Sequence, residues 1–384
     1  MEITGGEVFL VSLPARRDHA WASKMQQPIG RHAIVRLDTN EGLAGWGEAP
    51  AIANWGGSAM RYYGETPQTV RHIVGDYLLP AIRGFEPADI GPLHTRMDAV
   101  VKGHPYAKAA IDIACHDLAG RALGVPVHQL LGGKRRGGVK LAHSLGIMDV
   151  DRCIDEAEQV AAEGVRAIKC KTGLDRDRDI NVVAQLRERL GDAVDLRVDA
   201  NEGYQTVAEA VEVTRRQEEH RLLLCEQPVA GARALAAVAE RVDTPVMADE
   251  SAWTLQDILE LHELGSVACF SCYVTKPGGL WPARQQAEVA AALGFVCDIG
   301  GSIEMGIGNA ANLHLAAALE AVTLPSVCPV TKPAGAPGPE LAGVYYLDDV
   351  VTEPFELRDG RVLIPEGPGL GIEVDVEKIE RYSA

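Results

Sequence analysis

Two lysines stand one residue apart in the segment AIKCKTG, residues 167–173, whose composition is typical of a buried strand. Because side chains along a strand alternate between its two faces, Lys169 and Lys171 point to the same side. An apolar interior penalises an ammonium group that has no partner. The pair therefore predicts groups of opposite charge nearby.

Acidic residues follow at the ends of the next apolar runs. Asp199 stands in RVDAN, Glu226 comes 27 residues later in CEQP, and Asp249 comes 23 residues after that in MADES. Lys276, in VTKPGG, follows Asp249 by another 27 residues. Each spacing is about the length of one strand–helix unit, so these side chains are expected at the carboxyl ends of neighbouring parallel strands. That rim carries the catalytic residues of (β/α) barrels.

Three carboxylates at one rim repel each other unless a cation lies between them. Oxygen ligands of this kind suit a hard divalent ion, Mg²⁺ or Mn²⁺. A lysine beside another ammonium group and a metal has its neutral form favoured, which makes it a usable base. Such a set predicts movement of a proton α to a metal-bound carboxylate, with the metal stabilising the enediolate. The alternatives are solvated rim acids or helix caps, and lysines that only pair with them.

The elements that must position these residues form an alternating series. Between residues 131 and 330, short apolar runs alternate with amphipathic helical patterns, which predicts parallel strands joined by helices. The expected fold is α/β, with a (β/α) barrel of seven or eight units. Residues 1–130 show period-two strands followed by helical patterns, an α+β part. The turn-rich tail, residues 331–384, is expected to return to that part.

Composition argues against several classes of protein. The 384 residues carry a formal charge of −17, which disfavours nucleic acid and anionic membranes as partners. No apolar run has the length that a membrane span needs, and the first residues lack a secretory signal pattern. Eight scattered cysteines without CxxC pairs indicate free thiols in a reducing compartment. We expect a cytoplasmic protein that acts on a small molecule.

Taken in order, the motifs resemble the enolase superfamily, in its mandelate racemase and muconate-lactonizing-enzyme branch. The resemblance covers nearly the whole chain and rests on KxK at 169–171, VDAN at 198–201, EQP at 226–228, ADES at 248–251, KPGG at 276–279 and GGSIEMGIG at 300–308. It implies a modified TIM barrel under an α+β capping domain, the latter formed by the N-terminal part and the C-terminal tail.

The resemblance also implies a role for each residue of the set. By this likeness Asp199, Glu226 and Asp249 bind Mg²⁺. Lys171 and Lys276 form the acid/base pair. Lys169 helps to bind the substrate carboxylate and lowers the pKa of its neighbour.

Within this branch the chain looks most like the muconate cycloisomerases. The cap carries MQQ at 25–27, and its loop at 54–65 is of the kind that closes over substrate in the family. Trp55 and Tyr62 in this loop are expected to line the pocket or to pack the cap. Glu304, in SIEMGIG, matches a glutamate of the lactonizing enzymes and is expected to bind substrate.

Asp298, in CDIGG, departs from the family pattern. An extra carboxylate there suits recognition of an ammonium or hydroxyl group on a substrate, and it is treated as a substrate-binding candidate. The alternative is that Asp298 caps a helix or pairs with a lysine.

Three functional hypotheses stay open. The leading one is a Mg²⁺-dependent cycloisomerase that closes a cis,cis-muconate-like dicarboxylate to a lactone, with a lysine protonating the enolate. The same machinery suits a racemase, epimerase or dehydratase of a small carboxylate such as an N-substituted amino acid or proline derivative. The third is a barrel that binds ligands without catalysis. The expected partners are a small carboxylate substrate and further copies of the chain in a homo-oligomer.

Overall fold

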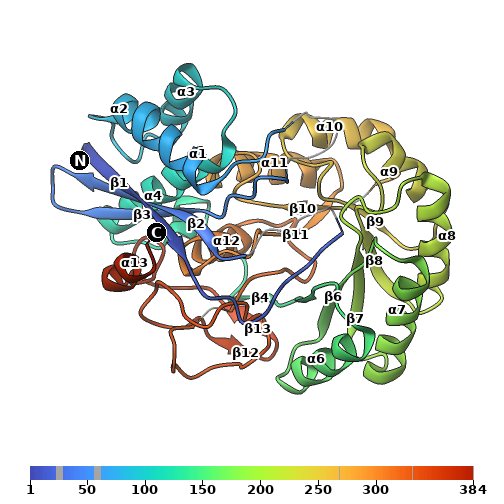
Figure 1. Ribbon diagram of the computed structural model, residues 1–384. Coiled ribbons are helices and arrows are strands. Elements are labelled where there is room, and N and C mark those ends of the chain that lie inside the picture. The colour runs from blue at the N-terminus through green and yellow to red at the C-terminus, as the bar shows by residue number, and fades with distance from the viewer. Residues whose placement is uncertain (23–28, 56–61, 268, 331, 384) are drawn as a thin grey trace.

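The computed structural model describes residues 1–22, 29–55, 62–267, 269–330 and 332–383. In this part of the chain, seven parallel strands form a curled sheet in the spatial order β11-β10-β9-β8-β7-β6-β5 (Figure 1). The strands are β5 (His143–Leu145), β6 (Ala167–Lys171), β7 (Asp195–Asp199), β8 (Leu222–Glu226), β9 (Val246–Ala248), β10 (Cys269–Cys272) and β11 (Val296–Ile299). The spatial order follows the sequence order, as the predicted strand–helix alternation requires.

A helix follows each of these strands and covers the outer face of the sheet (Figure 1). The helices are α6 (Val150–Ala162), α7 (Arg176–Leu190), α8 (Val207–Glu218), α9 (Ala232–Ala239), α10 (Leu255–Leu264), α11 (Leu280–Ala292) and α12 (Gly306–Ala318). Side chains cap several of these helices: Asp175 accepts a hydrogen bond from the Arg178 amide at the start of α7, and Thr206 caps α8 in the same way, whereas α9, α11 and α12 have no side-chain cap. The α/β barrel architecture expected from the sequence is confirmed.

An irregular segment, residues 321–327, closes the gap between the two edges of the sheet. On one side the Val327 amide donates to the Ile299 carbonyl at the end of β11, 3.1 Å away. On the other side the Ser326 amide donates to the Lys140 carbonyl, 2.8 Å away, in the short strand β4 (Gly138–Lys140) that precedes β5. The ring therefore consists of regular strands and one stretch without regular strand structure.

The first part of the chain forms a separate antiparallel sheet from β1 (Ile3–Ser12), β2 (Arg31–Thr39) and β3 (Ala44–Ala49). Helical segments follow: α1 (Pro67–His72), the π-helix η2 (Ile73–Leu78), α2 (Leu79–Ile82), α3 (Ile90–Val100), α4 (Pro105–Leu123) and α5 (Val127–Leu130). The first three segments follow one another without a gap, so residues 67–82 form one helical run with a π-helical stretch in its middle, in agreement with the helical pattern of the sequence. Pro80 stands just after the π-helical stretch and lacks the N–H that a residue inside a helix donates.

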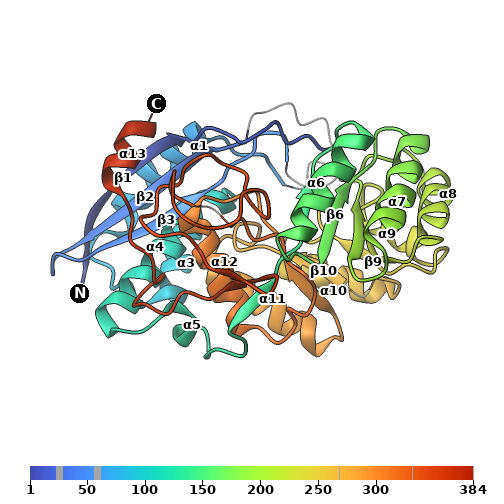
Figure 2. The ribbon, with the colours of Figure 1, turned by 90° about the horizontal axis from the view of Figure 1, so that it is seen from below.

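The C-terminal tail contacts both parts of the molecule. Strands β12 (Leu357–Arg358) and β13 (Arg361–Leu363) form a small sheet with β4, and helix α13 (Val376–Tyr382) lies beside β1 (Figure 1). Seen from below, both chain ends lie on the side of the β1–β3 sheet (Figure 2). The division at residues 130 and 330 stays a prediction.

Two further observations concern the cysteines and the helices of the described residues. All eight cysteines lie among the described residues, and each is a buried free thiol, as the sequence indicated. Among the same residues, no helix combines the length and apolar character that crossing a membrane requires.

Two glycines of β3 let the cap sheet approach helix α4 closely. A Cβ atom on Gly47 would lie 1.9 Å from the Ala110 carbonyl oxygen, and one on Gly45 would lie 2.4 Å from the Ala114 carbonyl oxygen. Such distances leave no room for a side chain, so the strand and the helix must move apart if either glycine is replaced.

We predict that Gly47→Ala lowers the free energy of unfolding by about 1–3 kcal/mol, because overpacking displaces β3 from α4. The matched control is Gly75→Ala in η2, where an added Cβ has no neighbour within 4 Å. That variant is expected within about 1 kcal/mol of the parent protein. Urea unfolding of both variants measures the difference, and equal midpoints would contradict the close-packing argument.

Candidate active site

Lys169 and Lys171 lie on β6 and point to one face of the strand, as predicted. Lys171 is paired in register with Asp199 on β7, and Asp199 is paired with Glu226 on β8. Lys169 lies opposite Ser144 on β5. All of these side chains are buried. The predicted common level of the strand-end residues is therefore confirmed for Lys171, Asp199 and Glu226.

The two lysines form ion pairs with the first two acids. Lys169 Nζ lies 2.8 Å from Asp199 Oδ2 and 2.7 Å from Glu226 Oε1. Lys171 Nζ lies 2.6 Å from Asp199 Oδ2 and donates to Asn201 Oδ1 at 2.7 Å. Burial lowers the pKa of Lys169, but the charges of Asp199 and Glu226 outweigh it and hold the pKa above its ordinary value. Lys169 is therefore a fixed cation, suited to binding an anionic group.

Glu226 is the least compensated of the acids. Burial and the neighbouring charge of Asp199 raise its pKa to about 7, against the opposing effect of Lys169. Among the described residues its Oε2 has no hydrogen-bond donor, and the Arg197 guanidinium lies 3.5 Å away. A buried carboxylate oxygen without a donor is costly in the folded protein unless a cation binds it.

Lys276 does not end a strand, contrary to the prediction. β10 ends at Cys272, and Lys276 lies in the turns that follow. Its side chain folds back: Nζ donates to the Asp249 carbonyl at 2.8 Å and to the Ser271 carbonyl at 3.2 Å, and pairs with the Asp249 carboxylate. Nζ also lies 4.0 Å from the centre of the Tyr273 ring. Lys276 thus approaches the acids from the β10 side, opposite to Lys171.

The three acids form a row of buried carboxylate groups, the kind of oxygen ligand that a hard cation prefers. In the described part of the chain, however, no three His, Cys, Asp or Glu side chains stand together in a metal-binding arrangement. Each acid is instead paired with a lysine. The three carboxylates suit a divalent ion, because such ions prefer oxygen ligands and Glu226 Oε2 accepts no hydrogen bond from the described residues. The ligand assignment of Asp199, Glu226 and Asp249 stays a prediction.

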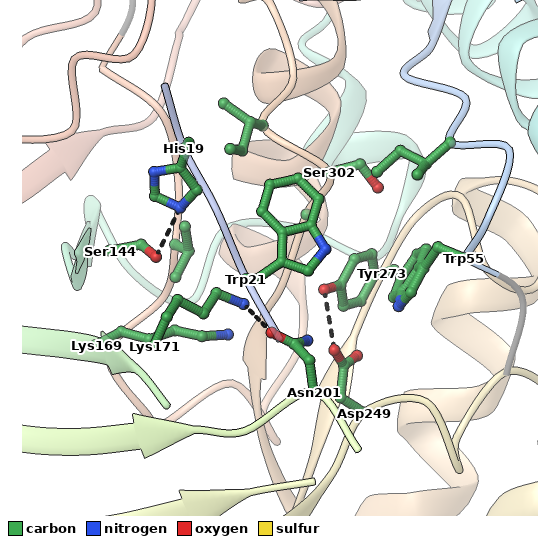
Figure 3. Close-up of a pocket in the computed structure, with 14 residues that line it drawn as sticks. His19, Trp21, Trp55, Ser144, Lys169, Lys171, Asn201, Asp249, Tyr273 and Ser302 are labelled. Carbon is green, nitrogen blue, oxygen red and sulfur yellow. Dashed lines mark hydrogen bonds between the residues drawn. The ribbon is translucent and has the colours of Figure 1, made fainter. Parts of the chain in front are cut away.

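A pocket opens at this end of the barrel (Figure 3). It is lined by Lys169, Lys171, Asn201 and Asp249 from the motifs, and by His19, Trp21, Ile52, Trp55, Ser144, Tyr273, Gly301, Ser302, Ile303 and Val327. Sequence reasoning missed His19, Trp21, Ser144 and Tyr273. Tyr273 could have been predicted from the sequence, because it stands three residues before Lys276 in CYVTK. His19 and Trp21 stand in a stretch without any motif.

Of the cap-loop candidates, Trp55 lines the pocket and Tyr62 does not appear among the described lining residues. Trp55 Nε1 donates to Glu250 Oε1 at 3.3 Å, and its ring lies 5.2 Å from that of Tyr273. Tyr62 instead stacks on Trp253, with ring centres 5.1 Å apart, so it packs the cap against the barrel. Residues 25–27 and the 56–61 part of the loop lie outside the described residues.

Asp298 and Glu304 are buried, and neither appears among the described lining residues. Asp298 lies 2.7 Å from Arg197 Nη2, so its partner is an arginine rather than the lysine considered above, and it offers no carboxylate to the pocket. Glu304 lies behind the pocket wall: its Oε1 accepts a hydrogen bond from the Ser302 amide at 3.1 Å. Burial and the nearby Glu48 raise the pKa of Glu304 to about 7.

Comparison with known proteins identifies relatives over the whole chain. Residues 8–132 match the family model "Mandelate racemase / muconate lactonizing enzyme, N-terminal domain", and residues 152–379 match "Enolase C-terminal domain-like". The chain is 33% identical to muconate cycloisomerase 1 of Rhodococcus opacus over 100% of its own length and 99% of that protein.

Solved structures show the same likeness. The crystal structure of N-succinyl Arg/Lys racemase from Bacillus cereus superposes with a TM-score of 0.90 at 28% identity, over 100% of this chain and 98% of that one. Muconate lactonizing enzyme from Pseudomonas putida superposes with a TM-score of 0.88 at 28% identity, over 100% of both chains.

The raised pKa of Glu304 predicts a pH-dependent stability. Its carboxyl binds a proton more tightly in the folded protein, from an ordinary pKa of 4.5 to about 7, so the contribution to stability is present below pH 4.5 and is lost as the pH rises through 7. The whole change amounts to about 3 kcal/mol. Glu304→Gln cannot titrate and should therefore gain in thermal stability relative to the parent between about pH 5 and pH 8.

Calorimetric unfolding at the two pH values measures this gain. Glu188→Gln, an exposed position of α7, is the control and should alter stability little at either pH. A Glu304→Gln difference that does not grow with pH would show that Glu304 is not a protonated carboxyl in the folded protein.

Proposed function

Because the chain belongs to the mandelate racemase and muconate lactonizing enzyme family, we propose that it is an isomerase that moves a proton on the carbon next to a carboxylate. The observation that carries the proposal is the row of three buried acids with lysines at both ends, of which Asp249, Lys169 and Lys171 line the pocket. The substrate is a small carboxylate. The cytoplasmic location and the homo-oligomer stay predictions.

Asp199, Glu226 and Asp249 are proposed to hold a divalent cation, Mg²⁺ or Mn²⁺. When bound, such an ion supplies positive charge that makes the C–H bond next to a substrate carboxylate more acidic. Glu226 Oε2 supports this assignment, because among the described residues it accepts no hydrogen bond and has only a 3.5 Å ion pair with Arg197. Lys169, a buried cation beside these acids, binds and orients the same carboxylate.

Lys171 and Lys276 are proposed to exchange the proton. Lys171 lines the pocket from β6, and Lys276 pairs with the pocket residue Asp249 from the turn after β10, so the two ammonium groups lie on opposite flanks of the acids. The Tyr273 and Trp55 rings lie 4.0 and 5.5 Å from Lys276 Nζ and shield it from water. Exclusion of water leaves the substrate carbon as the acceptor or donor of the lysine proton.

The leading reaction is the closure of a cis,cis-muconate-type dicarboxylate to a lactone. In this step one carboxylate oxygen adds to the carbon–carbon double bond, and a lysine delivers a proton to the neighbouring carbon, so that atoms and charge balance. The names of the relatives from Rhodococcus opacus and Pseudomonas putida support this substrate class.

The second candidate is the racemisation of an N-acylated amino acid. It is favoured by the presence of a lysine on each flank, because inversion needs a base on one face and an acid on the other. The likeness to the Bacillus cereus racemase supports it. Dehydration of a small carboxylate uses the same groups. A binding protein without catalysis is disfavoured, because the set of acids and lysines is complete.

Removal of one ligand tests the metal assignment. Glu226→Gln keeps the side-chain volume and removes the charge, so the affinity for Mg²⁺ should fall by about 10-fold or more while the fold is retained. Asp117→Asn, a buried acid of α4 in the cap, is the control and should bind Mg²⁺ as the parent does. Titration calorimetry measures both, and chelation of the parent should abolish turnover. Unchanged Mg²⁺ affinity in Glu226→Gln would remove this residue from the ligand set.

Exchange of substrate hydrogen with D₂O distinguishes the two reactions. A racemase needs both lysines, so Lys171→Ala and Lys276→Ala should each stop turnover while each still exchanges the α-hydrogen of one enantiomer. A cycloisomerase needs one proton donor, and we expect Lys171→Ala to abolish lactonization of muconate and Lys276→Ala to slow it. Lys140→Ala, a lysine paired with Asp195 outside the pocket, is the control.

Proton NMR in D₂O, with cis,cis-muconate and with an N-succinyl amino acid, follows both processes. Lactonization of muconate by Lys171→Ala at the parent rate would contradict the proposed role of this lysine. Absence of exchange and of turnover by the parent with either compound would contradict the proposed function.

A further inference from the structure

His19 lines the pocket beside the lysines (Figure 3), and one of its ring nitrogens contacts an arginine. Arg17 Nη1 lies 3.2 Å from His19 Nδ1. A guanidinium group has only donors, so Nδ1 must be the acceptor in this pair. In a neutral imidazole the hydrogen then resides on the other nitrogen, Nε2. The contact therefore decides which tautomer His19 adopts.

Arg17 cannot easily turn away, because Glu156 holds it. Arg17 Nε lies 2.9 Å from Glu156 Oε2, and Arg17 Nη2 lies 2.8 Å from Oε1, a two-bond fork. Burial, and then the charges of Arg17 and Lys171, hold the pKa of His19 well below its ordinary value. The ring is thus neutral as well as fixed in its tautomer.

The second nitrogen of His19 faces Ser144 on β5. His19 Nε2 lies 3.4 Å from Ser144 Oγ, and since Nε2 carries the hydrogen, the serine oxygen is the acceptor (Figure 3). The hydroxyl hydrogen of Ser144 is then directed elsewhere, and Ser144 also lines the pocket. The long distance leaves the Nε2–H free to shift toward a closer acceptor. Ser144 lies opposite Lys169 in the strand register, so these donors meet the same region.

We propose that Arg17 fixes His19 as the Nε2–H tautomer, so that His19 offers a hydrogen-bond donor and no acceptor to a substrate oxygen beside Lys169, with the Ser144 hydroxyl as a second group that can donate. The ligand chemistry is that of an acceptor oxygen, either the distal carboxylate of a dicarboxylate or the carbonyl of an N-acyl group. His19 and Ser144 are specificity-determining residues, and Arg17 is a positioning residue that acts through His19. The inference rests on the proposed function for its substrate and on the Arg17 contact for its geometry.

The pocket surface formed by His19, Ser144 and Lys169 disfavours substrate groups that donate hydrogen bonds, as well as favouring groups that accept them. An ammonium or a hydroxyl hydrogen placed against His19 would face the Nε2–H and the Lys169 cation, and the Ser144 oxygen beside them already accepts from His19. Free amino acids and amine-bearing substrates are therefore disfavoured relative to N-acylated amino acids and dicarboxylates.

Nitrogen NMR of the histidine rings tests the tautomer without any need for turnover. In the parent protein, His19 is expected to show an unprotonated Nδ1 and a protonated Nε2 between about pH 6 and pH 8, where an ordinary histidine titrates. The His19→Gln variant identifies the signal by its loss. In Arg17→Met the signal should change to a mixture of tautomers or to the charged ring.

Arg16→Met is the matched control. Arg16 also pairs with Glu156, at 2.8 Å, but its Nε donates to the Val344 carbonyl rather than to His19. This variant removes an equal charge from the same carboxylate and should leave the His19 signal as in the parent. A protonated Nδ1 in the parent, or equal effects of Arg16→Met and Arg17→Met, would overturn the tautomer assignment.

Binding and kinetics test the specificity. With cis,cis-muconate and with an N-succinyl amino acid as probes, His19→Phe should weaken binding by about 10- to 100-fold, the effect of a lost hydrogen bond to an acceptor of this kind. His19→Gln keeps a side-chain N–H and should restore part of the loss, with KM changed more than kcat. The probe that perturbs the Nε2–H signal more identifies the source of the oxygen.

The outcomes are separable from those of the proposed function. If the parent turns over a substrate and His19→Phe has the same KM for that substrate as the parent, this inference is wrong and the proposed function stands. The opposite outcome is also distinguishable. If the parent shows no turnover, but His19 has the expected tautomer and either probe perturbs its Nε2–H signal, then the proposed reaction is wrong and the role of His19 as a hydrogen-bond donor is supported.

Discussion

Burial of like charges at one end of the barrel is the constraint on which this structure depends. Asp199, Glu226 and Asp249 are almost completely withdrawn from water, and none could remain charged there without a nearby cation. The lysines of β6 are the cations on one side of the acids, and Lys276, in the turn after β10, is the cation on the other side. The charge pairs that stabilise these buried acids consist of the groups proposed to carry out the chemistry, so the proposal links stability and reactivity at this site.

The division of labour between the two parts of the molecule follows from this constraint. Barrel strands fix the charges, and segments of the cap give the pocket its shape through the His19 and Trp55 rings. The two parts also meet at Tyr106: its amide, at the start of α4, donates to Glu65 within the cap, and its Oη lies 3.0 Å from Ser302 Oγ in the pocket wall. A change in the cap therefore reaches the pocket through α4.

Much of this site could be predicted from the chain, because strand periodicity and unit length determine which side chains share a face and a level. That reasoning located Lys171, Asp199 and Glu226 correctly. It failed for Lys276, because a turn rather than a strand carries that lysine. It could not locate His19, since the contact of His19 with Ser144 joins positions 125 residues apart. Periodicity determines what a strand presents, but not what another segment brings to it.

The irregular segment that completes the barrel has a consequence for behaviour at high concentration. A sheet with free edges offers rows of unpaired amides to another chain, which is a common route to aggregation. Here residues 321–327 bond to the β11 edge on one side and, on the other, to Lys140 and Ala142, which stand directly before β5. Because the segment has no regular strand of its own, it covers both edges without presenting a new template for strand addition. Loss of this short stretch would turn a self-contained ring into a surface that recruits other molecules.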